Sequence, residues 1–249
     1  MVVLKSKAEL EIMRQAARII SSIAKGLCTH VKSGVTTKKL DELANELILQ
    51  ENVEPAFKGY QGYPATICTS INEVIVHGIP ENRSLRDGDI LSLDLGIKYK
   101  EFYSDIALTV CVGEVKPKIK KLVDVTKKAL FEGIRYAKVN NHVSDISSSI
   151  QNYVEKNGFS IVRNFVGHGI GRNLHEEPEV PNFGKPKHGL ILKSGMVLAI
   201  EPMVNMGSWE CVILEDGWTA VSKDRLPSAH FEHTIAITDE GPEILTSFN

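Results

Sequence analysis

The segment ILSLDLGIKYKEFYSDIALTV, residues 90–110, has the pattern of two apolar strands joined by a polar turn, and each strand carries one aspartate. With the turn centred on Tyr99-Lys100, Asp94 falls directly opposite Asp105. Like charges that face each other across a strand pair are destabilising. We therefore expect another group to neutralise these two carboxylates.

Three further ionisable residues stand in apolar or glycine-rich surroundings: His168 in FVGHGIG, Glu201 in LAIEPMV and Glu232 in HFEHTIAI. Taken singly, an aspartate in a strand is more often an edge or turn residue. Burying four carboxylates without a basic partner nearby in sequence would be prohibitive, whereas bound cations remove the conflict. Four carboxylates and one imidazole form a hard, oxygen-rich set that could hold two divalent ions.

The composition is that of an ordinary globular protein. Among the 249 residues, 43% are hydrophobic and 24% are charged, enough to build a sizeable core. The net charge of −2, with no polybasic tail, argues against nucleic acid or a membrane as the main partner. The basic run KPKIKKL is best explained as the solvated start of a helix.

The four cysteines, Cys28, Cys68, Cys111 and Cys211, form no CxxC pair and are widely spaced. This usage favours a reducing compartment over a disulfide framework. The N-terminus has no signal-peptide pattern, and no apolar run approaches the roughly 18 residues of a membrane span. We therefore expect a cytoplasmic protein.

Two amphipathic helices are predicted at the start of the chain. Ser6 and Glu9 form a capping box, and an apolar stripe follows from Ile12 to Leu27. KSGVTT ends this helix, and Thr37 is the expected cap of the second one. A tract rich in Gly, Pro and Tyr leads from there into strands.

The same order returns at an offset of 107 residues, where the cap Thr37 falls on Ser144 and the apolar stripes coincide. Any two amphipathic helices match at some offset, but here cap and stripe agree at a single one. We expect an α+β duplication: one catalytic domain, 1–249, with pseudo-symmetric halves 1–113 and 114–249. A cleft between the halves is the natural place for a site.

Several motifs identify the family that the chain resembles. GYPATICTSINEVIVHGIP, the two-Asp hairpin, VGHGIGRNLHEEPEVPNFG, GMVLAIEPMV, EDGWTAV and SAHFEHTIAIT together resemble the type I methionine aminopeptidases over essentially the whole chain. The resemblance implies the pita-bread fold, with pseudo-twofold halves around a central antiparallel sheet. It also implies removal of the initiator methionine from new polypeptides when the second residue is small. We see neither an N-terminal zinc-finger extension nor the helical insertion of type II enzymes.

The resemblance assigns roles to individual residues. Asp105 and Glu232 would bridge two divalent ions, Asp94 would chelate one of them, and Glu201 would also shuttle a proton. His175 would steady the developing oxyanion, and His77 would contact the amide nitrogen. The implied metal ligands are Asp94, Asp105, His168, Glu201 and Glu232.

The resemblance also implies a methionine pocket and a second cation site. The pocket would be lined by Tyr60, Tyr63, Cys68, Leu174 and Trp218, with Phe57 nearby. Aromatic and soft apolar groups suit a flexible thioether, and nothing near Cys68 in sequence supports a nucleophilic role. Cobalt, manganese, iron and zinc all suit the ligand set. Backbone carbonyls of Asn72, Val74 and Ser228 would hold a sodium or potassium ion.

Five positions depart from the commonest family pattern. Leu174 stands where many members have Phe, Phe57 where some have Cys, and Ser92 where Asn is common. Ile106 and Gly96 stand where Thr is frequent. None of these positions is a predicted ligand, so the departures concern the shape of the pocket and the groups behind the ligands.

Nascent polypeptide N-termini are the expected substrate, with transient ribosome contact, and we expect a monomer. Two alternatives stay open at this point. One is an Xaa-Pro aminopeptidase or prolidase-like hydrolase of the same fold, although those enzymes usually carry a separate N-terminal domain. The other is a non-catalytic binding relative, which would be expected to have lost ligands.

Overall fold

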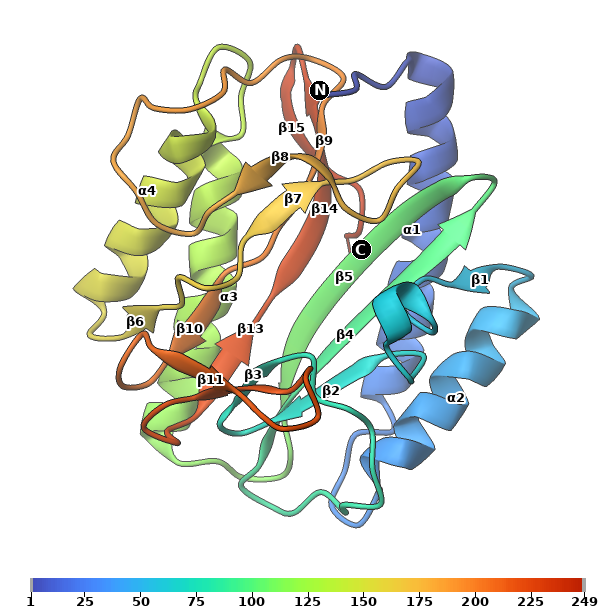
Figure 1. Ribbon diagram of the computed structural model, residues 1–249, viewed down its shortest axis with the longest axis vertical. Helices are drawn as coiled ribbons and strands as arrows, with labels where there is room; N and C mark the ends of the chain where they lie inside the picture. The colour runs from blue at the N-terminus through green and yellow to red at the C-terminus, as the bar shows by residue number, and fades with distance from the viewer. Residues whose placement is uncertain (1, 248–249) are drawn as a thin grey trace.

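The computed structural model describes residues 2–247 and arranges them as a curved antiparallel sheet with helices packed behind it (Figure 1). The helices are α1 (Lys7–Cys28), α2 (Thr37–Gln50), α3 (Pro117–Tyr136) and α4 (Val143–Lys156), with a 3₁₀ turn η1 at Tyr60–Gly62. The strands are β1 (Glu54–Pro55), β2 (Cys68–Ile71), β3 (Val74–Val76), β4 (Ile90–Tyr99), β5 (Phe102–Cys111), β6 (Ser160–Ile161), β7 (Gly167–Gly169), β8 (Glu176–Val180), β9 (Val197–Ile200), β10 (Met203–Asn205), β11 (Cys211–Ile213), β12 (Ala220–Ser222), β13 (Ser228–His230), β14 (Glu232–Thr238) and β15 (Gly241–Ile244).

The main sheet runs in the order β1-β4-β5-β14-β9-β7-β8, with β2 added to β4 and β15 to β14, and all of these pairs are antiparallel. Two small sheets, β13-β10-β6 and β11-β12-β3, lie beside it. The two halves of the chain meet where β5 pairs with β14. Helices α1 and α2 flank the strands of the first half, and α3 and α4 flank those of the second (Figure 1). No helix within residues 2–247 combines the length and the hydrophobicity that a membrane span requires.

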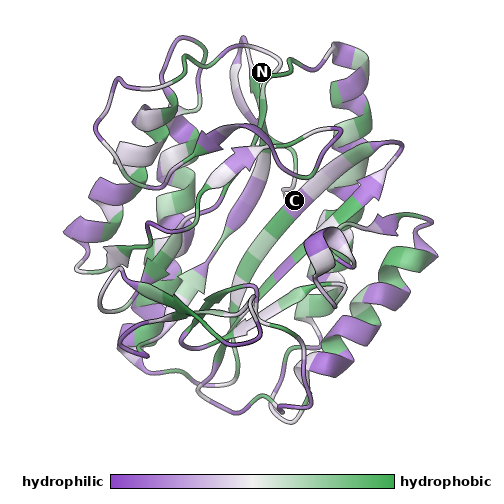
Figure 2. Ribbon diagram, viewed as in Figure 1, coloured by the Kyte–Doolittle hydropathy of each residue, from purple (hydrophilic) through white to green (hydrophobic). Residues whose placement is uncertain are grey.

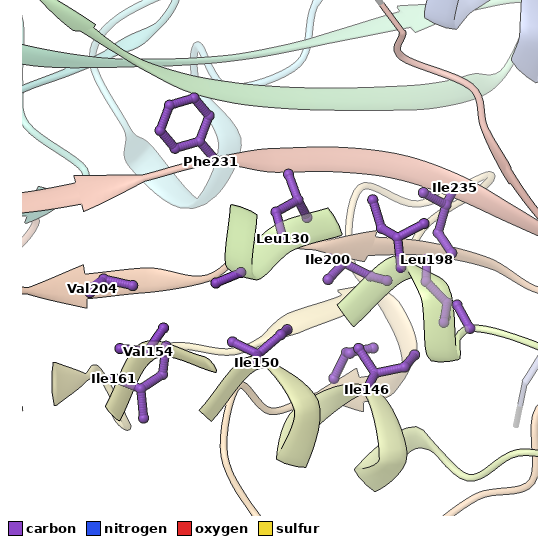
Figure 3. Packing of buried hydrophobic residues seen from close by; sticks show 14 of the residues in the cluster. Leu130, Ile146, Ile150, Val154, Ile161, Leu198, Ile200, Val204, Phe231 and Ile235 are labelled. Atoms are coloured by element: carbon purple, nitrogen blue, oxygen red, sulfur yellow. The ribbon is translucent and has the colours of Figure 1, made fainter. Parts of the chain in front are cut away.

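Each helix buries one apolar face, and the opposite faces are hydrophilic (Figure 2). In the second half, Leu130 of α3 and Ile146 and Ile150 of α4 pack toward Leu198 and Ile235 of the sheet (Figure 3). Full burial of each such side chain contributes about 1.5–3 kcal/mol relative to exposure. These helices therefore form a rigid backing for the sheet.

The predicted capping box of α1 is confirmed. The Ser6 backbone N–H donates to Glu9 Oε2 at 2.9 Å, and the Glu9 N–H donates to Ser6 Oγ at 3.3 Å. The second predicted cap was wrong by one residue, because Thr36 Oγ1 accepts from the Lys39 N–H at 3.1 Å. The hydroxyl of Thr37 instead donates to the carbonyl of Glu81, which fastens the start of α2 to a distant loop.

The predicted cap at Ser144 was also wrong. Helix α4 is capped at His142, whose N–H donates to Asp145 Oδ2 at 2.8 Å. Ser144 Oγ instead accepts from the N–H of His188 at 2.7 Å. Thr37 and Ser144 both use their hydroxyl groups for hydrogen bonds to the backbone of distant segments. Residue type alone therefore did not determine where these helices begin.

The offset between the halves is 107 for the first helix pair only. In α1 and α3, buried Ile23 and Leu27 correspond at this spacing to buried Leu130 and Ile134. Helices α2 and α4 begin at Thr37 and Val143, which gives 143 − 37 = 106. At 106 the buried residues Leu40, Ala44 and Ile48 correspond to Ile146, Ile150 and Val154. The division of the chain into pseudo-symmetric halves, 1–113 and 114–249, remains a prediction.

The predicted register of the Asp hairpin was wrong. The turn residues are Lys100 and Glu101, both with positive φ (45° and 69°), as a two-residue type I′ turn requires. Asp94 therefore pairs with Ala107, and Asp105 pairs with Gly96. Because the register moves by two residues, both carboxylates keep the same face of the sheet but stand diagonally, which lessens their repulsion.

Two helix glycines at the offset of 107, Gly26 and Gly133, test how tightly each half packs. A Cβ at Gly133 of α3 would lie 2.7 Å from Ile150 of α4, whereas one at Gly26 of α1 would meet Leu47 of α2 at 3.7 Å. We expect Gly133→Ala to lower the free energy of unfolding by about 1–3 kcal/mol through overpacking. Gly26→Ala, the matched control, should be neutral or stabilising by up to about 1 kcal/mol, since alanine is the better helix former. Urea melts of both variants measure this; an equal loss in both would contradict the packing difference.

Candidate active site

One cavity of about 170 Å³ collects the predicted site residues. Its walls are Phe57, Tyr60, Gln61, Tyr63, Cys68, His77, Asp94, Asp105, His168, Leu174, His175, Glu201, Trp218 and Glu232. All five predicted metal ligands, both predicted catalytic histidines and all six predicted methionine-pocket residues are therefore brought together.

The order of the strands explains why the predicted ligands meet. Five consecutive neighbours in the sheet, β4-β5-β14-β9-β7, carry the predicted ligands on the strand or directly after it. Asp94 comes from β4, Asp105 from β5, Glu232 from β14 and His168 from β7, while Glu201 directly follows β9. Short hydrophilic stretches accordingly interrupt the apolar central strands (Figure 2). Residues up to 138 positions apart in sequence thus form one row across the concave sheet, since 232 − 94 = 138.

Burial raises the pKa of all four carboxyl groups. The pKa of Asp94 rises to about 7, with a hydrogen bond from Cys68 opposing part of the shift. The pKa values of Asp105, Glu201 and Glu232 lie well above their usual range, first through burial and then through the charges of the other acids. Among the described residues that line the cavity, none is Lys or Arg. The protein itself therefore supplies no fixed positive charge to these acids.

The histidines of the cavity do not supply positive charge either. Burial lowers the pKa of His168 to about 3 and that of His77 to about 4, and it lowers the pKa of His175 in the same direction. These imidazoles are neutral near pH 7. A divalent cation is the simplest group that would let several of the acids ionise together.

The donor set fits a cation. One ligand atom each from Asp105, His168 and Glu232 lie within 4.8 Å of one another. His168 Nδ1 lies 2.8 Å from the carbonyl of Gly169, an arrangement in which the N–H bonds the backbone and Nε2 keeps its lone pair for a metal. Asp94 Oδ1 and Glu232 Oε1 are buried without a hydrogen-bond partner among the described residues. Asp94 and Glu201 line the same cavity outside the close trio.

Two neutral histidines sit beside the acids with defined surroundings. Tyr60 Oη lies 2.7 Å from His175 Nδ1, so a His175 that accepts this bond carries its proton on Nε2. The ring of His77 packs edge-on against Phe165 and Trp218, with centroids 5.4 and 6.3 Å away. Both histidines can therefore act as hydrogen-bond donors to a bound molecule rather than as charges.

The apolar end of the cavity is buried, and its side chains pack against one another. Tyr63, Cys68 and Leu174 are nearly inaccessible to solvent. Tyr63 also stacks edge-on with Trp218 at 5.2 Å. A Cβ at Gly96 would come within 2.7 Å of the Phe57 ring and 3.0 Å of the Ala56 Cβ, so the ring occupies most of the space that a larger residue at 96 would need. The departures from the family pattern at positions 57 and 96 are therefore physically linked.

The predicted monovalent cation site lies outside the cavity. Asn72, Val74 and Ser228 are not among its walls, although the backbone N–H of Ser228 donates to the carbonyl of Asn72 at 2.8 Å. A bond between two of the three chosen positions shows that they are neighbours. Binding of sodium or potassium there stays a prediction.

Sequence reasoning missed two residues. Gln61 lines the cavity with a left-handed backbone (φ 49°), in a tract where the sequence offered no periodic signal. His230 lies with its Nε2 3.7 Å from Glu201 Oε2. The sequence could have indicated His230. It stands two positions before the candidate Glu232, and residues two apart in an extended segment share a face.

Comparison with known proteins is consistent with this site. A family model described as metallopeptidase family M24 matches residues 11–239. The chain belongs to metallopeptidase family M24. It is 50% identical to a methionine aminopeptidase of Clostridium perfringens over 99% of both chains, and 49% identical to methionine aminopeptidase 1 of Bacillus subtilis over 99% of both.

Solved structures agree with the same assignment. The crystal structure of methionine aminopeptidase from Thermotoga maritima matches with a TM-score of 0.98 and 44% identity, over 99% of this chain and 100% of that one. The chain thus lies among the methionine aminopeptidases, and the pita-bread fold is confirmed. A prolidase from Pyrococcus horikoshii OT3 has a TM-score of 0.81 at 24% identity, with 99% of this chain and 64% of that one covered, and shows the shared fold alone.

The raised carboxyl pKa values predict how metal-free protein responds to pH. Asp94 has an ordinary pKa of 3.8 and a folded value of about 7, so the fold is favoured while the group is protonated. The contribution of protonated Asp94 to the free energy of unfolding is therefore fully present below the unfolded pKa, near 4. It is lost as the pH rises toward 7. Asp105, Glu201 and Glu232 shift the same way. The melting temperature of chelator-treated protein should therefore fall across this window.

Adding Mn²⁺ at pH 7 should restore the melting temperature. At a free Mn²⁺ concentration of roughly 100 Kd, the free energy of unfolding should rise by about 2.7 kcal/mol. For a chain of this size, this raises the melting temperature by on the order of 5–10 °C. Scanning calorimetry at several pH values, with metal content measured in parallel, tests this. Equal melting temperatures with and without bound metal would contradict it.

The contact between Phe57 and Gly96 predicts a coupled pair. Gly96→Thr should cost about 1–3 kcal/mol of stability, because the new Cβ meets the Phe57 ring. Phe57→Ala removes the closer of the two neighbours and leaves the Ala56 Cβ at 3.0 Å, so the double variant should lose less than the sum of the single losses, by at least about 0.5 kcal/mol. Denaturant melts of the parent chain, both single variants and the double variant measure this coupling. Strictly additive losses of stability would show that the Phe57 ring does not restrict the size of the side chain at position 96.

Proposed function

We propose that this chain hydrolyses the first peptide bond of polypeptides that begin with methionine, using divalent cations held by Asp94, Asp105, His168, Glu201 and Glu232. The observation that carries the proposal is the union, in one cavity, of a carboxylate-rich ligand set with a closed aromatic pocket. Relatives at about half identity are named methionine aminopeptidases, which supports the same reaction.

The apolar end of the cavity would select methionine. The whole cavity, with its polar end included, has a volume of about 170 Å³, below the roughly 300–1,000 Å³ of sites for drug-sized ligands, so its apolar end suits one small side chain. Tyr63, Cys68, Leu174 and Trp218 offer aromatic faces and a soft sulfur to a flexible thioether. A charged first residue would find no opposite charge among these four side chains.

The polar end would carry out hydrolysis. Bound divalent cations would lower the pKa of a water molecule and polarise the scissile carbonyl. Glu201 would accept a proton from the water and deliver it to the departing amine, a role that suits a buried carboxylate of raised pKa. His175, with its proton on Nε2, would donate to the carbonyl oxygen as negative charge grows on it. His77 would contact the amide nitrogen.

The proposed substrates are the N-termini of new polypeptides with a small second residue. Four free cysteines suit a reducing compartment, and we place the reaction in the cytoplasm. No structural observation favours the Xaa-Pro alternative, because its support is a shared fold. Retention of all five ligand-type residues argues against a non-catalytic relative.

The choice of substrate gives the direct test. The second residue must sit beside the acids and histidines, where a bulky side chain would displace the carbonyl. Misplacing it by about an ångström costs on the order of a hundredfold in rate. We therefore expect kcat/KM for Met-Ala-Ser to exceed that for Met-Lys-Ser by more than about a hundredfold.

Ala-Pro-Ser serves as the control peptide and should remain intact. A ratio near one for the two methionine peptides would indicate a general aminopeptidase with an open cleft. Preferential cleavage of Ala-Pro-Ser would establish the Xaa-Pro alternative instead.

A further inference from the structure

Glu201 lies between two imidazoles that approach different oxygens of its carboxylate. His168 Nε2 is 3.5 Å from Oε1, and His230 Nε2 is 3.7 Å from Oε2. His168 belongs to the close trio of ligand atoms with Asp105 and Glu232, whereas His230 does not. The two oxygens of Glu201 therefore have different surroundings, one on the side of the trio and one away from it.

His230 is a buried polar group that lacks a partner. Its side chain is 2% exposed, and Nε2 has no hydrogen-bond partner among the described residues. Leaving a buried donor or acceptor unsatisfied costs about 1–3 kcal/mol. The separation of 3.7 Å from Glu201 exceeds a hydrogen bond, but such bonds in active sites are often long until the site is loaded and then tighten.

The backbone of His230 is held firmly, so its ring has a fixed origin. The His230 N–H donates to Thr109 Oγ1 at 2.9 Å, and the same hydroxyl lies 2.8 Å from the His230 carbonyl oxygen. Ser92 Oγ lies 2.8 Å from Thr109 Oγ1, and Met203 pairs with His230 across the small sheet. Sites built on strands in this way are more precise than sites on loops.

We propose that His230 is a positioning residue of the metal site: its Nε2–H donates to Glu201 Oε2 and thereby directs Oε1 toward the cation. The inference rests on the proposed metal site and adds a partner behind one of its ligands. Such partners orient ligand carboxylates, and their loss typically costs 10–100-fold in metal affinity or activity. His230 acts through Glu201 and does not itself touch the cation.

The test compares three variants as folded, metal-stripped proteins titrated with Mn²⁺ by calorimetry. His230→Leu removes the donor and should weaken Mn²⁺ binding by about 10–100-fold, whereas His230→Gln, which keeps an N–H donor, should stay within about threefold of the parent chain. His233→Gln is the matched control. His233 is another buried histidine, 6% exposed, on β14, and it lines a different cavity, so its substitution should leave Mn²⁺ affinity unchanged.

Kinetics at saturating Mn²⁺ supply the second measurement. His230→Leu should lower kcat for Met-Ala-Ser and leave KM within about twofold, because the methionine pocket is untouched. Should the leucine variant fail to fold, His230→Asn, whose shorter side chain cannot reach Glu201, replaces it in both measurements.

Two results would overturn the inference. If the donor-free variant binds Mn²⁺ as tightly as the parent chain, Glu201 does not depend on His230. If His230→Gln is impaired as strongly as His230→Leu while His233→Gln is not, His230 is itself a ligand. Failure of the parent chain to bind Mn²⁺ at all would instead refute the proposed metal site.

Discussion

Mutual repulsion among buried carboxylates is the constraint on which the rest of the structure depends. Asp94, Asp105, Glu201 and Glu232 share one cavity, and burial raises the pKa of each. An uncompensated cluster of this kind would oppose folding. The sheet nonetheless gathers the four acids on or next to adjacent strands, with a neutral imidazole at one end, an arrangement that the proposed divalent cations would stabilise.

The remaining parts of the fold hold this row of acids in place. The strand order brings one predicted ligand on or next to each of five neighbouring strands, and the helices of each half form an apolar backing for those strands. The aromatic end of the cavity lies next to the acids, so a methionine side chain bound there, as we propose, would lie beside the reacting carbonyl. Binding energy gained in the pocket can thus be used to orient the peptide bond.

Much of the site could be predicted from sequence, but its finer geometry could not. The five ligand-type residues stood out because each is an ionisable residue in an apolar context. The hairpin register was wrong because Lys100 and Glu101 adopt left-handed conformations that the non-glycine sequence KYKEFY does not announce. The caps at Thr37 and Ser144 were wrong because distant backbone groups claim those hydroxyls. Gln61 was missed for lack of any pattern.

The central claim is that divalent cations neutralise the buried acids, and anomalous diffraction from a crystal grown with Mn²⁺ tests it most directly. We expect anomalous density inside the cavity in contact with Asp105 and Glu232, with Asp94 on one side and His168 on the other. Density confined to the molecular surface, with the cavity free of metal at saturating Mn²⁺, would contradict the account. The acids would then have to be held as neutral, protonated groups.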